Sequence, residues 1–245
     1  MASQGACIGM QGHVSPTSRT CFTPPTHRAF GARRPSAPRP LPPCNAIGVP
    51  RVPYRVPKQN QWLWVDIWNC LYRERIIFLS KAVDDELGNQ LVATMLYLDS
   101  ENKKDLNLYI NCSGGEVMPC LALADTMRHI KSDVGTVGFG GAMGMPGFLL
   151  AVGKKGKRVV LQNTRIMLHH PSGVARGQAS DINREAQELL KTRDYMNAVL
   201  AEATGQDFNT VARDFARNKY FDADEAKEYG LIDQVVKPKR KSIFN

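Results

Sequence analysis

The apolar residues of this sequence follow two different spacings from residue 64 onward. Short apolar runs, such as 76–80 and 105–112, have the composition of buried strands, and the segments between them repeat apolar residues every three or four positions. In 84–101 the residues on the apolar face are Leu87, Leu91, Thr94, Met95 and Leu98. We therefore predict a helix at 84–101, with acidic residues in its first turn, between two strands.

The same two spacings predict the remaining elements. Further helices are expected at 64–75, 117–130, 145–153 and 180–205, and two shorter ones follow, the second from Asp222 to about Gly230. Further strands are expected at 134–140, 157–162, 164–170 and 231–236. Strands that alternate with helices form parallel sheets with right-handed crossovers, so functional residues should lie at strand ends and in the loops that follow them.

Two glycine-rich loops occur at such strand ends, at 111–116 and 138–144. Glycine allows backbone N–H groups to approach a substrate closely, and two loops of free amides facing one cleft suit an oxyanion. Segment 138–153 contains no Ser, Thr or Cys, however, so this turn offers no nucleophile. Glycines also permit close packing of a helix on a strand, and the residues alone leave both interpretations open.

Charge is distributed unevenly along the chain. Residues 1–65 contain eight Lys and Arg residues, no Asp or Glu, and eleven of the fifteen prolines, whereas the rest of the chain contains 24 basic and 23 acidic residues. An acid-poor N-terminus with Ser and Arg is typical of an organellar transit peptide, which we place at 1–50. A disordered extension that is never cleaved is the alternative. The near-neutral remainder does not favour nucleic-acid binding.

Several other classes of site find no support. The basic C-terminal residues, 239–245, fit a solvated tail. No apolar run reaches the roughly 18 residues that a membrane span needs. Cys70, Cys112 and Cys120 form no CxxC pair and have no histidine at metal spacing. We expect reduced, buried thiols, no metal and no cofactor.

Five blocks of the sequence, in order and spacing, resemble ClpP, the proteolytic core subunit of the Clp protease. The blocks are INCSGGEV (110–117), the stretch 125–158, TRIMLHHPSG (164–173), GQASDI (177–182) and FDADEAKEYGLID (221–233). The resemblance covers about 60–238. It implies an α/β protein of the ClpP/crotonase fold, with repeated ββα units and a handle helix that interlocks two rings, in a domain that we place at 51–238.

The resemblance also implies where a catalytic triad would stand. The family histidine falls at His169, with His170 as its non-catalytic neighbour, and the family aspartate falls at Asp181. The nucleophilic serine aligns with Gly144. Glycine has no hydroxyl for a histidine to activate, so the acyl-enzyme route is lost.

Other parts of the family's site are retained. Gly114 and Gly115 match the oxyanion loop, and Met145 matches the residue after the serine, whose N–H is another oxyanion donor. Pro146 departs from the pattern, although proline is tolerated in a first helical turn. The chain thus resembles the non-proteolytic ClpR-type members of plastids and cyanobacteria, and the transit-like N-terminus indicates the plastid stroma.

The resemblance further implies assembly. ClpP-type subunits form heptameric rings stacked as a tetradecamer, so the implied partners are paralogous ClpP and ClpR subunits and an AAA+ Clp unfoldase. Segment 177–204 matches the handle; its apolar residues, which fit either a handle interface or a core helix, are Leu189, Leu190, Tyr195, Val199 and Leu200. In the cleft that receives unfoldase loops, Tyr109 is retained and Asn107 replaces a second aromatic residue.

Three alternative functions have less support from the sequence. An active peptidase would need an unexpected nucleophile, such as Ser113 or Ser172, and several ångströms of backbone rearrangement. An acyl-CoA enzyme of the crotonase type is disfavoured by the His–Asp pair and the GQASDI block. A basic nucleic-acid-binding protein is disfavoured by the near-neutral body of the chain.

Overall fold

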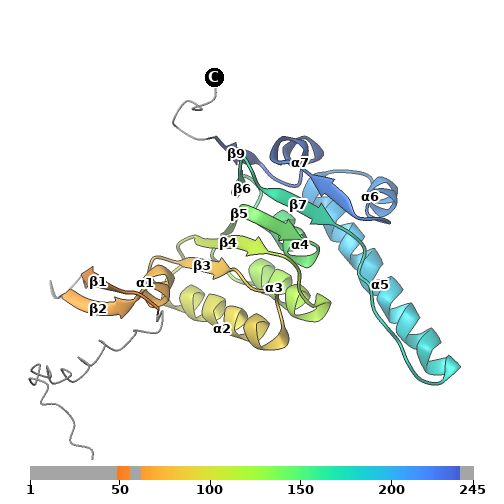
Figure 1. The fold of residues 1–245 in the computed structure, drawn as a ribbon, viewed down its shortest axis with the longest axis horizontal. Helices are drawn as coiled ribbons and strands as arrows, with labels where there is room; N and C mark the ends of the chain where they lie inside the picture. Colours follow the sequence, from red (N-terminus) through yellow and green to blue (C-terminus); the bar gives the residue numbers. More distant parts are fainter. Residues whose placement is uncertain (1–48, 56–61, 238–245) are drawn as a thin grey trace, which may run out of the picture. The chain divides into compact units, whose positions relative to one another are not determined.

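The fold was analysed in a computed structural model of the chain, which describes residues 49–55 and 62–237 (Figure 1). The predicted C-terminal tail and all but the end of the predicted transit peptide lie outside these residues. The strands are β1 (Arg51–Arg55), β2 (Trp62–Asp66), β3 (Ile76–Leu79), β4 (Leu106–Cys112), β5 (Val134–Met143), β6 (Arg158–Leu161), β7 (Arg165–Leu168), β8 (Lys219–Phe221) and β9 (Gln234–Val236). The helices are α1 (Ile67–Arg73), α2 (Asp85–Glu101), α3 (Val117–His129), α4 (Met145–Val152), α5 (Ala179–Thr204), α6 (Phe208–Asp214) and α7 (Ala223–Tyr229).

The main sheet has the strand order β3-β4-β5-β6-β9, and all of these neighbours are parallel. Strand β7 joins β5 in parallel and β8 in antiparallel orientation. Along β4, alternate residues such as Leu106 and Leu108 are buried in the core, while Asn107 and Tyr109 between them lie on the other face. The predicted α/β fold of the ClpP type, with its mostly parallel sheet, is confirmed.

Strand β5 bends in its middle, and this bend positions the candidate site. Its first part pairs with β4 and β6, whereas Gly141 to Met143 pair with β7. Gly140 lies at the bend with φ +69°, and Asn111 Oδ1 accepts a hydrogen bond from the Gly141 N–H at 3.2 Å. The bend brings the end of β5 beside β7, so that the turn into α4 lies next to the residues that follow β7.

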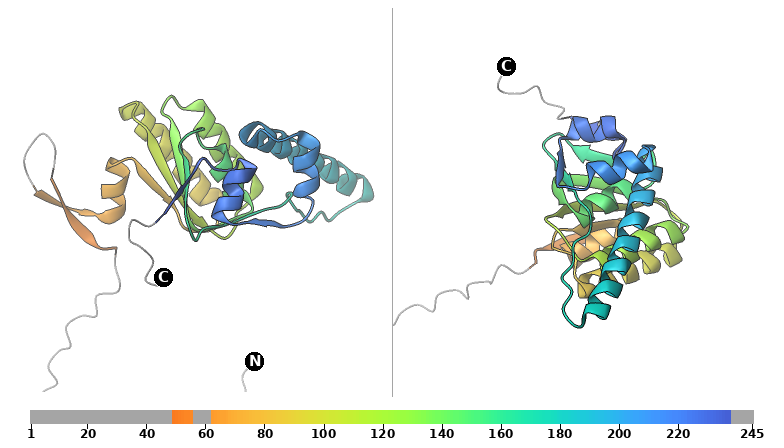
Figure 2. Two further views of the ribbon diagram at one scale, coloured as in Figure 1. Left: turned by 90° about the horizontal axis from the view of Figure 1, so that it is seen from above. Right: turned by 90° about the vertical axis from the view of Figure 1, so that its right-hand side faces the viewer.

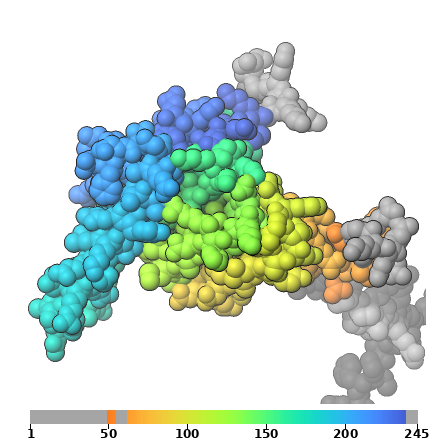
Figure 3. All heavy atoms as spheres, turned by 180° about the vertical axis from the view of Figure 1, so that it is seen from behind, coloured from red at the N-terminus to blue at the C-terminus, as the bar shows by residue number. Residues whose placement is uncertain are grey.

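Helix α5 has two different halves. Met196, Val199 and Leu200 in its second half are buried in the core, whereas Ile182 and Leu190 in its first half are 40% and 48% exposed. Figures 1 and 2 show the first half extending away from the sheet, and Figure 3 shows it (cyan) without neighbours on the visible side. Gly205 ends the helix in the left-handed conformation, at the position expected from the sequence.

Most predicted elements agree with the structure, including α7, which begins with the expected capping box of Asp222 and Glu225. The predicted helix at 64–75 is wrong at its start, because 64–66 belong to β2, which pairs with β1. Strand β1 was not expected because its segment is rich in proline, which usually excludes a paired strand. Within the described residues, no helix is both long and apolar enough to cross a membrane.

Candidate functional site

The end of β5, the start of α4, the end of β7 and the first glycine loop surround one small pocket of about 110 Å³. Its lining residues are Ser113, Gly114, Gly115, Val117, Met143, Gly144, Met145, Met167, His169, Pro171 and Ser172. The structure therefore brings together every residue predicted for the catalytic and oxyanion positions except Asp181.

Gly144 occupies the sharp turn from β5 into α4. Its backbone has φ +67° and ψ −120°, a conformation that glycine adopts far more readily than other residues. The Gly144 N–H donates to the Met167 carbonyl at 2.7 Å, and the Gly144 carbonyl accepts from Phe148 N–H at 3.2 Å. A Cβ built on Gly144 would lie 3.1 Å from His169 Nε2. A side chain at this position would therefore point at the imidazole.

The His169 ring is held by its own backbone neighbourhood. Its Nδ1 lies 2.5 Å from the His170 carbonyl oxygen, which accepts only, so Nδ1 carries the proton. Nε2 is the ring nitrogen that faces Gly144, where an active enzyme of this type would hold a hydroxyl. The base is in place and the group it would deprotonate is absent.

Asp181 lies elsewhere, in the first turn of α5, with an exposed side chain. A carboxylate is stabilised there by the helix dipole. Among the described residues, no hydrogen bond or ion pair joins Asp181 to His169, whose Nδ1 is already bonded to a carbonyl. The structure does not bring these two predicted site residues together.

Asn218 lies near His169, just beyond the ladder of β7 and β8. The last pair of that ladder is Leu168 with Lys219, and His169 and Asn218 are the next residue on each side of it. Sequence analysis did not single out Asn218, because β8 is only three residues long and gives no periodic signal. An amide at this position cannot supply the negative charge that stabilises an imidazolium.

Gly114 and Gly115, in the first glycine loop, differ in how closely other atoms surround them. A Cβ on Gly115 would lie 2.8 Å from Val83 Cβ, so close packing requires glycine there. A Cβ on Gly114 would meet nothing within 4 Å. The loop is anchored by Cys112, whose Sγ–H lies within hydrogen-bond distance of the Gly114 carbonyl. Gly115 therefore serves packing, and Gly114 leaves the loop open toward the pocket.

The start of α4 closes the opposite wall of the pocket. Met145 is the first residue of the helix and is 6% exposed, and Pro146 follows it in the first turn. Pro146 has no N–H to offer an oxyanion, but the first-turn N–H groups of a helix have no intrahelical partner in any case. Helix α4 still forms, so the proline at position 146 removes one backbone N–H donor from the site without preventing the helix.

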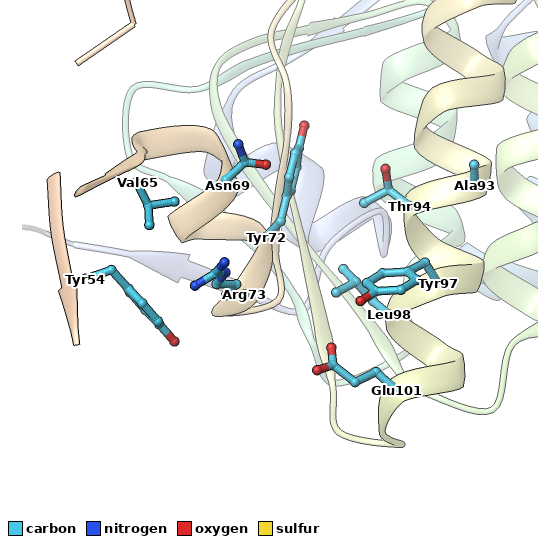
Figure 4. A pocket seen from close by; sticks show the side chains of 10 residues that line it. All are labelled: Tyr54, Val65, Asn69, Tyr72, Arg73, Ala93, Thr94, Tyr97, Leu98 and Glu101. Carbon is cyan, nitrogen blue, oxygen red and sulfur yellow. The ribbon is translucent and has the colours of Figure 1, made fainter. Parts of the chain in front are cut away.

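A larger cleft, of about 1030 Å³, lies between α2 and the segment that contains β1, β2 and α1. Figure 4 shows Tyr54 and Arg73 on one side of it and Thr94, Tyr97 and Glu101 on the other. The Arg73 guanidinium lies 5.0 Å from the Tyr54 ring centre. Among the described residues, no histidine, serine or cysteine lines this cleft, so it does not offer the Ser–His pair of a serine peptidase.

The face of the sheet opposite the buried residues of β4 carries a cluster of aromatic side chains, which we call the aromatic face. Tyr109 stacks on Phe78 with ring centres 5.1 Å apart, and Phe139 and Trp68 contact Phe78 edge-on. Asn107, two residues before Tyr109 on β4, is exposed on the same face. The structure thus places both residues of the predicted unfoldase cleft on one surface.

Comparison with known proteins gives consistent matches. A family model described as "Clp protease" matches residues 58–239. The chloroplastic ATP-dependent Clp protease proteolytic subunit-related protein 2 of Arabidopsis thaliana is 51% identical over 195 residues, covering 79% of this chain and 70% of the relative. Proteolytic subunit 1 of Gloeobacter violaceus is 52% identical over 78% of this chain and 96% of the relative. The Clp proteolytic subunit of Chlorella vulgaris is 48% identical over 78% of this chain and 95% of the relative.

Proposed function

Because the chain belongs to the Clp protease family, we propose that it is a catalytically inactive, ClpR-type subunit of a plastid ATP-dependent Clp protease core. The observation that carries this proposal is the position of Gly144. A side chain there would face His169 Nε2, and glycine supplies no hydroxyl. The exposed position of Asp181 and the amide at Asn218 support the same conclusion, because neither provides His169 with a carboxylate partner.

In this proposal the subunit acts through assembly. It joins paralogous ClpP and ClpR subunits in heptameric rings that stack as a tetradecamer, and the first half of α5 serves as the handle between rings. The partly exposed Ile182 and Leu190 support this role, since both are apolar and present 40% and 48% of their surface to solvent. His169 and Gly144 are then remnants of a triad, and Gly114, Gly115 and Met145 are remnants of the oxyanion site. Asp181, the predicted third member of the triad, lies away from them on α5.

The location that we propose is the plastid stroma. The acid-poor N-terminus at 1–50 fits a transit peptide, and one relative that covers most of this chain is named chloroplastic. Relatives from the algae Oltmannsiellopsis viridis and Chlorella vulgaris fit the same location. After cleavage the working subunit would consist of the ClpP-like domain at 51–238 and a short basic tail.

We also propose that the aromatic face forms part of the cleft for the AAA+ unfoldase, and that this subunit binds the unfoldase weakly. Tyr109 remains as an aromatic anchor, but Asn107 offers little area to bury. Asn107→Tyr should raise the affinity of a ring face built from this chain, measured by unfoldase binding to the assembled core. The proposal would be contradicted if the unfoldase bound ring faces of the unmodified chain and ring faces of an active paralogue with equal affinity.

The deciding experiment labels the native complex with a fluorophosphonate after isolation through a tag on this chain. Intact mass spectrometry should show adducts on co-purifying paralogues and none on this chain. An adduct on this chain would overturn the proposal and indicate a non-standard nucleophile. Ser113 and Ser172 are the residues to test by Ser→Ala substitution, because both line the pocket with His169.

A further inference from the structure

Three methionines and one histidine line the pocket at Gly144. Met143 ends β5, Met145 begins α4, Met167 lies on β7 and His169 directly follows β7. Among the residues that the structure describes, no Asp, Glu, Lys, Arg or Cys side chain lines this pocket. Thioethers and a neutral imidazole together form a soft, uncharged ligand set, and soft ligands of this kind select Cu(I) among the biological metals.

The imidazole is already oriented as a metal ligand would be. Metal-binding histidines usually donate their second ring N–H to a carbonyl or carboxylate, which fixes the tautomer and the ring position. His169 Nδ1 does this toward the His170 carbonyl at 2.5 Å. Its Nε2 faces Gly144, where no side chain competes for it.

We propose that this pocket binds one Cu(I) ion through His169 Nε2 and the sulfur atoms of at least two of Met143, Met145 and Met167. The volume of about 110 Å³ leaves room for an ion and for the long, flexible methionine side chains to turn their sulfur atoms inward. The uncharged lining suits a monovalent ion, because a divalent ion would leave more charge uncompensated in an apolar site.

The buried cysteines compete poorly for the ion. Burial raises the pKa of the Cys112 thiol and raises the pKa of Cys120 to about 12, so both remain protonated at neutral pH. A thiol must lose its proton to bind a metal. To keep the remaining cysteines from binding the ion, Cys70 and those of the N-terminal segment are alkylated with iodoacetamide before metal binding is measured.

The direct test uses Ag(I), a closed-shell analogue of Cu(I), on the alkylated full-length chain with ¹³C-labelled methionine methyl groups. One equivalent should shift the methyl resonances of the pocket methionines in the NMR spectrum. Met118, which is 73% exposed and outside the pocket, should not shift and serves as the internal control. Unmoved resonances of the pocket methionines would overturn the proposal.

A second measurement compares the Cu(I) affinities of variants by competition with a chromogenic chelator. Met143→Leu, Met145→Leu and Met167→Leu preserve side-chain volume, and at least two of the three should each weaken binding by about tenfold or more, whereas Met118→Leu should leave it unchanged. Equal affinity of all variants would overturn the proposal, because Cu(I) would then bind elsewhere on the chain. Neither measurement depends on peptidase activity, so the proposed Cu(I) site and the proposed inactivity can fail separately.

Discussion

Two regions of the molecule, the pocket at Gly144 and the first half of α5, differ in how their side chains are held. Gly144, Met145 and Pro146 are buried at the start of α4, and the pocket offers His169 neither a hydroxyl at position 144 nor a carboxylate partner. Ile182 and Leu190, in contrast, leave 40% and 48% of their surface exposed. Where packing maintains a site, a catalytic residue can be lost without lowering the stability of the fold. Exposed apolar side chains on a helix instead indicate a contact with another chain.

The largest effect is expected from charging the first half of α5. Ile182→Asp with Leu190→Asp should abolish pairing of rings that contain this chain, because two charges cannot be buried in an apolar contact. The free energy of unfolding should change by less than about 0.5 kcal/mol, since both positions are exposed. Native mass spectrometry of the tagged core measures the ring number.

The matched control is Lys191→Asp, which adds an acid at an exposed position on the same helix half and removes only an exposed ion pair with Glu188. It should leave double rings intact. Double rings in the Ile182→Asp, Leu190→Asp variant would show that this surface is not a ring contact.

The second-largest effect is expected from placing a hydroxyl at position 144. Gly144→Ser should leave peptidase activity at least about 10³-fold below that of an active family subunit, because His169 has no carboxylate partner. A serine Cβ would also crowd His169 Nε2 at 3.1 Å, and the positive φ would cost about 1–3 kcal/mol. Hydrolysis of a fluorogenic peptide by cores assembled with the variant is the measurement. Near-normal activity would show that the rest of the site still works.

A smaller effect tests whether packing maintains the pocket. A Cβ on Gly147 would approach the Ala142 carbonyl, the Met167 carbonyl and Leu168 Cδ2, each at 3.1 Å. Gly147→Ala should therefore lower the free energy of unfolding by about 1–3 kcal/mol, measured by urea denaturation. In the control Gly173→Ala the new Cβ would meet only Leu189 side-chain atoms, at 3.8 Å or more. If both variants are equally stable, packing does not constrain the pocket.

The smallest effect is expected at His170, which follows His169 of the pocket and lies near Arg193 and Asn197 of α5. Burial, together with the nearby Arg193 charge, lowers the pKa of His170, although Asp194 opposes the shift. The unfolded chain then binds more protons than the folded chain below about pH 6.5, so this stabilisation is complete above that pH and is lost as pH falls through the folded pKa.

His170→Gln should therefore reduce the loss of stability between about pH 7.5 and about pH 5.5, measured by urea denaturation at both pH values. His129→Gln, at an exposed position, is the matched control. An unchanged pH dependence in His170→Gln would contradict the assignment.

Much of the fold could be predicted from the local spacing of apolar and polar residues along the sequence. The apolar face of α2 and the capping box of α7 depend on residues close together in the sequence, and both agree with the structure. The lack of a hydroxyl side chain in 138–153 is also a property of the sequence alone. The helix expected at 64–75 was wrong at its start because β2 is fixed by pairing with β1, which local spacing does not reveal.

The sequence by itself determined the alternation of strands and helices, the close match to one family and the absence of a hydroxyl at Gly144. Only the tertiary structure decided which residues meet. It placed Asn218 and His169 next to the last pair of β7 and β8, left Asp181 exposed on α5, and separated the packing role of Gly115 from the open position of Gly114. The physical reason is that strand register and the bend in β5 bring together residues that are far apart in the chain.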